Sequence, residues 1–276
     1  MNGQPSALRI ASQWVIAAIL AAVLLALFLL VAGVQLTAED TGKRAHRRSV
    51  ATLTDIDARL PAIEAALSAA GSTPGNTVQV PAFPLPVQLT VGEAKALRGA
   101  ALRDRILDDS ATLLYDKGTA AWASADQAGV QRIDRVSSAG LVKTGLGMVR
   151  DSRHTIFVIA AILLAIVSLV LAAGLMMTIH DWNMRFVAMG SVVFAASLPC
   201  LAAAIAVRFA FKTAQTDADP FTKEMLDLGI GAVWIPIRDY LALSALGFGV
   251  AGLGALGMWL QSRPTQAPGP VLPRGQ

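Results

Sequence analysis

The sequence predicts an all-α integral membrane protein with four transmembrane helices and a helical aqueous domain inserted between helices 1 and 2. Hydrophobic residues make up 54% of the 276 positions and charged residues only 15%, whereas an ordinary soluble domain carries about 25% charged residues. Mean hydropathy is +0.55. Four apolar runs are long enough to cross a bilayer, and a long polar segment separates the first from the second. This combination excludes a disordered chain, a fibrous repeat and almost any plain soluble fold.

The four apolar runs define the predicted spans. Each holds 21 or 22 residues without Asp, Glu, Lys, Arg or His: residues 15–36, 156–177, 186–207 and 240–260. A helix of that length measures about 32 Å, which matches a hydrocarbon core of about 30 Å. Since backbone groups in lipid must bond to one another, the runs should be helical. Aromatic residues that favour the membrane interface flank them: Trp14, Trp182, Trp234, Tyr240 and Trp259.

The first run has a second interpretation, as a cleaved signal peptide. Arg9 would form the basic start, and residues 34–38 could precede a cleavage site. The apolar part of a signal peptide normally has about 7–15 residues. Because this run is much longer, an uncleaved membrane anchor is the favoured interpretation.

Residues 37–155 should form the aqueous domain. Its first helix is predicted from apolar residues at spacings of 3, 4, 3 and 4, namely Leu53, Ile56, Leu60, Ile63 and Leu67. Pro61 predicts a kink near Leu60, and Gly71 a helix end. Residues 72–89 contain four prolines and cannot be helical, although 77–80 and 87–89 alternate as short extended pieces do.

Two more helices are expected in the same segment. Thr90 and Glu93 match a capping box, so a helix should run from there to about Asp116, where Lys117 and Gly118 stop it. Apolar residues on one face of a further stretch predict another helix over residues 126–149. The domain should therefore be a compact helical unit with one proline-rich crossing.

Residues 208–239 are predicted to be a second extracytoplasmic loop. Pro220 is placed to open a short helix within it. Residues 229–237 are apolar but too short to span, so they should lie at the membrane interface or pack beneath the large domain. Residues 261–276 are rich in proline and polar residues, which predicts a disordered tail.

Membrane orientation follows from conflicting signals. An even number of spans places both termini on one side. That side carries few basic residues, Arg9, Arg185, Arg263 and Arg274, whereas many flank the large loop. The positive-inside rule therefore favours termini outside, but it weakens for loops longer than about 60 residues. A short N-terminal tail before a long apolar run is typical of a signal anchor. We therefore place the termini in the cytoplasm of a cell membrane, and the alanine-rich composition suggests a bacterial source.

Several kinds of chemistry find no support in the sequence. Its one cysteine, Cys200, lies in an apolar run, and His46, His154 and His180 lie in different segments. We therefore expect no metal, cofactor or catalytic residue. The neighbouring carboxylates Asp108 and Asp109 should point to different faces of a helix. The sequence pI is about 9.6, but Lys and Arg flank apolar runs, as lipid-facing residues do, so no nucleic acid is expected.

Small residues in the fourth span are the clearest specific feature. Ser244, Gly247, Ala251 and Gly254 form one stripe at spacings of 3, 4 and 3, and Ala245, Gly249 and Gly252 form a neighbouring stripe. Such stripes let helices approach closely in lipid, either within this bundle or in a homodimer or a complex with a membrane partner. Pro199 predicts a kink in the third span; a substrate site there is the alternative.

These features together favour a non-catalytic membrane protein that acts as an interaction, sensor or accessory subunit through its extracytoplasmic domain. Its expected partners are the lipid bilayer and a second copy or another membrane protein. One alternative is a transporter or channel component with a water-filled path near Pro199 or the fourth span. Another is an enzyme with a site at the membrane interface, although His154, Arg153 and Asp181 should lie apart.

Overall fold

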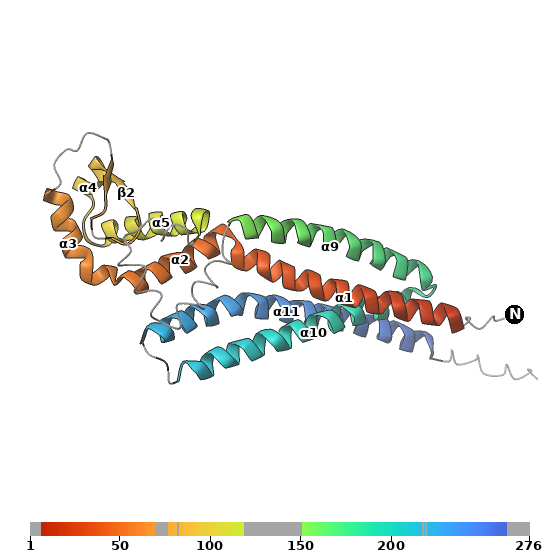
Figure 1. The fold of residues 1–276 in the computed structure, drawn as a ribbon. Coiled ribbons are helices and arrows are strands. Elements are labelled where there is room, and N and C mark those ends of the chain that lie inside the picture. The colour runs from red at the N-terminus through yellow and green to blue at the C-terminus, as the bar shows by residue number, and fades with distance from the viewer. Residues whose placement is uncertain are drawn as a thin grey trace, which may run out of the picture. The chain divides into compact units, whose positions relative to one another are not determined.

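The computed structural model describes residues 7–69, 77–81, 83–118, 151–216, 218 and 220–263. These residues form eight helices and two strands (Figure 1): α1 (Ala7–Thr37), α2 (Glu39–Thr54), α3 (Ile56–Ala69), β1 (Thr77–Gln79), β2 (Gln88–Thr90), α4 (Val91–Ala96), α5 (Gly99–Lys117), α9 (Asp151–Thr178), α10 (Trp182–Ala214) and α11 (Pro220–Gln261). Contacts divide the chain into two compact units. One contains Met1–Phe28, Leu163–Ala202 and Arg238–Gln276, and the other contains Leu29–Ile162 and Ala203–Ile237.

Within the part of the chain that the structure describes, four helices are long and apolar enough to cross a membrane, as many as the sequence predicts. Their apolar stretches are Ile10–Thr37, Arg153–Thr178, Trp182–Ala214 and Met225–Gln261. Large apolar side chains on these helices are exposed, for example Leu169 at 74% and Leu253 at 70%. Such exposure is expected where lipid rather than water surrounds a helix. The chain therefore fits a multi-pass membrane protein.

Residues 208–239, predicted as an extracytoplasmic loop, are largely helical in the structure, and their side of the membrane stays a prediction. Helix α10 continues to Ala214 and α11 begins at Pro220, so residues 215–219 alone connect the two helices. The predicted helix start at Pro220 is confirmed, because proline fits the first helical position. Residues 229–237, expected as a separate interfacial segment, belong to α11 although Pro236 lies among them. The charged residues that suggested a loop therefore lie largely on helices.

The first helices of the segment between α1 and α9 break at Asp55 rather than at Pro61. Asp55 ends α2 in the left-handed conformation, with φ 46°. Pro61 lies inside α3, so the kink or restart predicted near Leu60 does not mark the boundary. Pro61 is the sixth residue of α3, so it removes one main-chain hydrogen bond of that helix without ending it. The predicted helix end at Gly71 lies outside the described residues.

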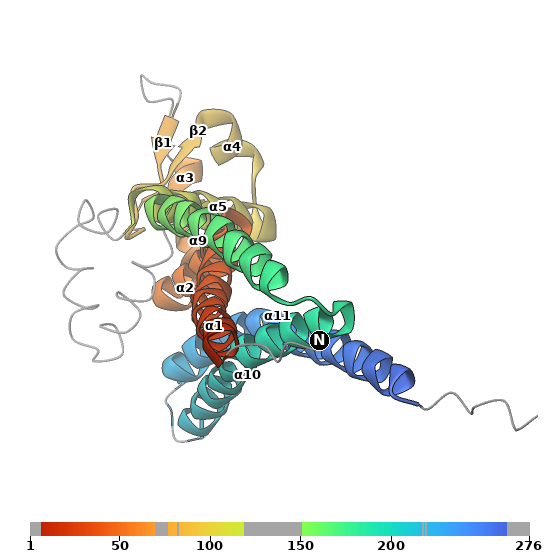
Figure 2. The same cartoon turned by 90° about the vertical axis from the view of Figure 1, so that its right-hand side faces the viewer.

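The predicted extended pieces form a hairpin. β1 and β2 pair antiparallel, with Val78 opposite Leu89, as Figure 2 shows beside α4. The pairing continues one step further, where the Val80 amide donates to the Val87 carbonyl at 3.0 Å. Prolines 81, 84 and 86 lie between the strands, where they remove no ladder hydrogen bond.

The capping box is confirmed, but the helix that follows is divided. The Glu93 amide donates to Thr90 Oγ1 at 3.2 Å, and the Thr90 amide donates to Glu93 Oε2 at 2.9 Å. α4 then ends at Ala96, because Leu97 is extended with ψ 135°. α5 begins at Gly99, which has φ +52°, a conformation that glycine adopts without strain. The helix predicted over residues 126–149 lies outside the described residues.

Helices α2 to α5 and the hairpin share one hydrophobic core. Ile56, Leu85, Leu89, Leu102 and Ile106 are fully buried in this cluster. Residues from α2, α3 and the hairpin meet the apolar face of α5 there, so residues separated by up to about sixty positions pack together. This core holds the charged side chains of α2 and α5 in place.

Candidate functional site

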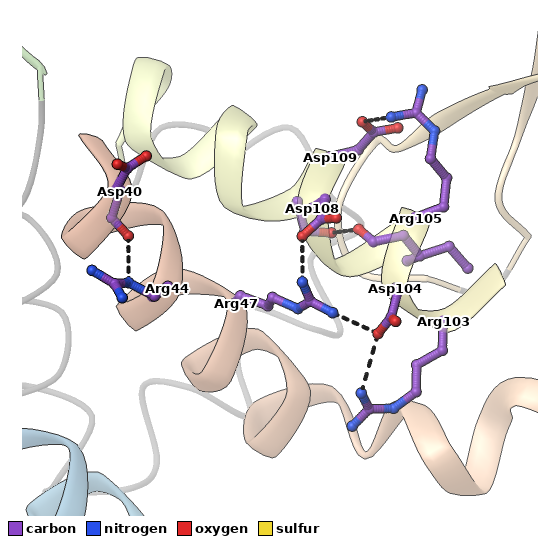
Figure 3. Close-up of polar contacts among 10 residues, drawn as sticks. Asp40, Arg44, Arg47, Arg103, Asp104, Arg105, Asp108 and Asp109 are labelled. Carbon is purple, nitrogen blue, oxygen red and sulfur yellow. Dashed lines mark hydrogen bonds and ion pairs between the residues drawn. The ribbon is translucent and has the colours of Figure 1, made fainter. Parts of the chain in front are cut away.

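Ion pairs join α5 to the helices packed beside it (Figure 3). Arg47 of α2 donates through Nη1 to Asp108 Oδ1 at 2.8 Å and through Nη2 to Asp104 Oδ1 at 2.5 Å. Asp104 and Asp108 are one helical turn apart, so both face α2. Arg103 binds Asp57 of α3 with two hydrogen bonds, of 2.6 and 3.1 Å. A two-pronged contact of this kind fixes geometry as well as charge.

Arg105 forms a second group of contacts. It donates to Glu93 Oε1 at 2.9 Å and to Asp109 Oδ1 at 2.7 Å. Asp108 and Asp109 therefore point to different arginines, as predicted for neighbours on a helix. Each carboxylate binds a different cation, and the two do not converge on a common point where they could share acid and base roles.

The environment shifts the acidity of three carboxyls in these groups. The Arg103 hydrogen bonds lower the pKa of Asp57. The Thr90 main-chain amide, followed by its hydroxyl, lowers the pKa of Glu93. Burial raises the pKa of Asp109, against the opposing effect of Arg105. Asp57 and Glu93 are thus held in their charged forms, as expected for groups that lock helices together.

A pocket of about 480 Å³ lies beside Arg47. Its lining includes Asp40, Lys43 and Arg44 from α2 and Asp108 from α5. Lys43 is paired with Glu39 at 2.6 Å. The Arg44 guanidinium donates through Nε to the Asp40 carbonyl at 3.0 Å, and Figure 3 shows the Asp40 carboxylate pointing away from it. The pocket thus offers charged groups of both signs to a polar ligand or partner surface.

A polar contact at Thr37 ties this charged region to two apolar helices. Thr37 is the last residue of α1 and is only 3% exposed. Its carbonyl accepts a hydrogen bond from the Tyr115 hydroxyl of α5 at 3.0 Å. Its own hydroxyl donates to the Gly33 carbonyl at 2.7 Å and lies 3.2 Å from His154 Nδ1 of α9. One residue therefore links the ends of α1, α5 and α9.

Sequence reasoning missed this junction. His154 lies within contact distance of Thr37, at 3.2 Å between Nδ1 and Oγ1. His46, in α2, is 1% exposed. The contact between Thr37 and Tyr115 joins residues 78 positions apart, and no local pattern indicates such a pairing.

The structure places all four residues of the predicted stripe against α10. Ser244 Oγ lies 2.9 Å from Ser197 Oγ. A Cβ atom on Gly247 would lie 2.7 Å from the Phe194 nitrogen, and one on Gly254 would lie 2.7 Å from the Asn183 carbonyl oxygen. A Cβ on Gly190 would meet the Ala251 main chain. Helix α10 covers this stripe in the structure. Its use by a partner protein stays a prediction.

Two polar side chains of α10 and α11 lie near main-chain carbonyls of α1. The Tyr240 hydroxyl donates to the Phe28 carbonyl at 3.1 Å, and Cys200 Sγ lies 4.0 Å from the Leu25 carbonyl oxygen. Pro199 lies inside α10; the kink there stays a prediction. These contacts bring α1 beside α10 and α11 at the same depth.

Comparison with protein-family models, with curated proteins and with solved structures finds no match. Among the residues that the structure describes, no group of three or more His, Cys, Asp or Glu side chains could hold a metal ion. The charged region of α2 and α5 must therefore be interpreted from its own geometry.

Proposed function

We propose that this chain is a non-catalytic protein of the cell membrane that acts as an interaction, sensor or accessory subunit. In this proposal α2 to α5 form an aqueous, extracytoplasmic domain between the first two spans, and both termini lie in the cytoplasm. The observation that carries the proposal is the Thr37 junction, where Tyr115 of α5 and His154 of α9 meet the end of α1. A ligand that moves α5 would act directly on the ends of two spans.

The chemistry of the charged region supports binding rather than catalysis. Its arginines and carboxylates are engaged across helices in pairs such as Arg47 with Asp108 and Arg105 with Glu93. Groups engaged in this way position a surface, whereas catalysis needs groups that converge on one reacting atom. The pocket at Asp40 and Arg44 is the proposed contact point, because its charges suit a polar partner.

Purification in a mild detergent tests this function. The tagged full chain should recover a membrane protein in fixed proportion, identified by mass analysis. The double variant Asp40→Ala with Arg44→Ala should lose most of that partner, while Lys95→Ala, on the exposed side of α4, should retain it. Recovery of the wild-type chain alone as a monomer would contradict the proposal.

A further inference from the structure

Arg238 of α11 lies at a depth where a charge is costly. Ser244 meets Ser197, and a Cβ on Gly254 would meet Asn183, so α11 runs antiparallel to α10. Arg238 is six residues before Ser244, which places it level with about Ala202 of α10. The apolar run of α10 extends about five residues further, so Arg238 lies about 8 Å inside that edge.

Helix α1 gives a second measure of this depth. Tyr240 reaches the Phe28 carbonyl, so Arg238 lies near Phe28 to Leu30 of α1. The apolar run of α1 ends at Leu36, about 9 Å further along. Both helices therefore place Arg238 within the apolar layer, although Arg238 and Asp239 lie just before the predicted start of the fourth span. An ionisable residue at such a depth needs a polar partner.

Among the residues that the structure describes, Arg238 has one ion pair, which is weak. Its side chain is 74% exposed, and its ion pair with the neighbouring Asp239 measures 3.5 Å. A guanidinium carries five N–H donors, and one long contact leaves most of them facing outward. The surface around Arg238 is where a stronger partner would bind.

Arg238 begins an exposed row along α11, which we call the outer seam. It contains residues at alternating spacings of 4 and 3: Arg238, Ala242, Ala245, Gly249, Gly252, Leu256 and Trp259. No atom of the described residues lies within 4 Å of a Cβ built on Gly249 or Gly252. This spacing keeps one face of a helix towards a partner helix, and small residues let the two backbones approach. The outer seam is distinct from the stripe that α10 covers.

We propose that the outer seam binds a transmembrane helix of a different protein, which carries an Asp or Glu carboxylate at the depth of Arg238. The carboxylate would accept two hydrogen bonds from the guanidinium, and the partner backbone would pack over Ala245, Gly249 and Gly252. This inference rests on the proposed accessory function and names the chemistry of the partner.

Charge decides between this partner and two other occupants. A second copy shares the orientation of the first, so pairing along the seam would place two Arg238 side chains at one level. Like charges at that depth repel strongly. A lipid phosphate could neutralise Arg238 at the layer's edge, but it would leave the surface at Gly249 and Gly252, deeper in the apolar layer, without a packing partner.

Binding of designed transmembrane peptides tests the proposal. The fluorescently tagged full chain is placed in phosphatidylcholine vesicles with a labelled Leu/Ala peptide that carries one Glu at the matching depth, and energy transfer gives the affinity. The Glu peptide should bind the wild type about tenfold more tightly than the same peptide with Gln. Arg238→Gln should abolish this preference. Ala245→Ile should weaken the binding of both peptides. Ala255→Ile, which lies off the outer seam on the same helix, should weaken the binding of neither.

A variant with the opposite charge at position 238 distinguishes loss of the ion pair from loss of the fold. Arg238→Glu should prefer a peptide with Lys over one with Glu. A Glu preference that persists in Arg238→Gln overturns the inference. Loss of the Glu preference when phosphatidylglycerol is added would also overturn the inference, because it would identify a lipid phosphate as the partner of Arg238. Tight self-association of the chain that Ala245→Ile disrupts would overturn it as well, because it would identify a second copy. If the Glu peptide shows no preference for the wild type, while the Asp40→Ala and Arg44→Ala double variant still loses the co-purifying partner, this inference is wrong and the proposed function stands.

Discussion

At the scale of single residues, the buried hydroxyl of Tyr115 is the most informative group. It is 4% exposed and donates to the Thr37 carbonyl, and burial raises its pKa. Tyr115→Phe keeps the ring but leaves that carbonyl with one bond fewer. We expect a loss of about 1 kcal/mol in the free energy of unfolding, measured by denaturation of the full chain in detergent and followed by circular dichroism.

A matched control isolates the junction. Ser68→Ala removes a hydroxyl that bonds only within its own helix, to the Glu64 carbonyl at 2.6 Å. It should change the free energy of unfolding much less than Tyr115→Phe does. Equal effects of the two variants would mean that Thr37 does not couple α5 to α1.

The charge on Glu93 gives a pH-dependent prediction. Because the Thr90 amide and hydroxyl lower its pKa below the ordinary 4.5, Glu93 stabilises the fold above that value and loses this effect as pH falls through the lowered pKa. Glu93→Gln keeps an oxygen acceptor but removes the charge. The variant should be less stable than the wild type at pH 7, and the two should converge in acid. Parallel stability curves over the whole pH range would contradict this cause.

At the scale of whole elements, the contact between α10 and α11 depends on glycine. A Cβ on Gly247 would lie 2.7 Å from the Phe194 nitrogen, so Gly247→Ala must push the two backbones apart. We expect a loss of about 1–3 kcal/mol, as for overpacking elsewhere. Gly252→Ala is the control, since its Cβ meets open space. Thermal unfolding in detergent should separate the two variants, and equal midpoints would mean that α10 and α11 do not pack at Gly247.

Local chemistry determined what could be predicted about the elements. The capping box at Thr90 and the helix start at Pro220 depend on a few neighbouring residues, and both were predicted correctly. The breaks at Asp55 and Gly99 depend on left-handed conformations, and nothing nearby in the sequence requires them there. The ion pairs between Arg47 and α5 depend on how two helices pack, so the sequence supplied the charged residues but not their partners.

At the scale of the whole molecule, hydropathy predicted the number of spans but not their limits. The charges at Arg238 and Asp239 marked the predicted start of the fourth span at residue 240, yet the helix extends back to Pro220. A membrane has no marker in a sequence beyond changes in polarity. The depth of Arg238 becomes apparent only once Ser197 and Phe28 provide levels on neighbouring helices.

The last prediction concerns the side of the membrane on which each connection between spans lies. Cysteine labelling of intact cells tests it. In a Cys200→Ala background, single cysteines are introduced at three exposed positions: Lys117, Thr216 and Ser262. Four spans place Lys117 and Thr216 on one side and Ser262 on the other. With cytoplasmic termini, a membrane-impermeant maleimide should label the first two from outside, and Ser262→Cys only after lysis. The reverse pattern would keep four spans and invert the orientation, whereas different results at Lys117 and Thr216 would disprove the number of spans.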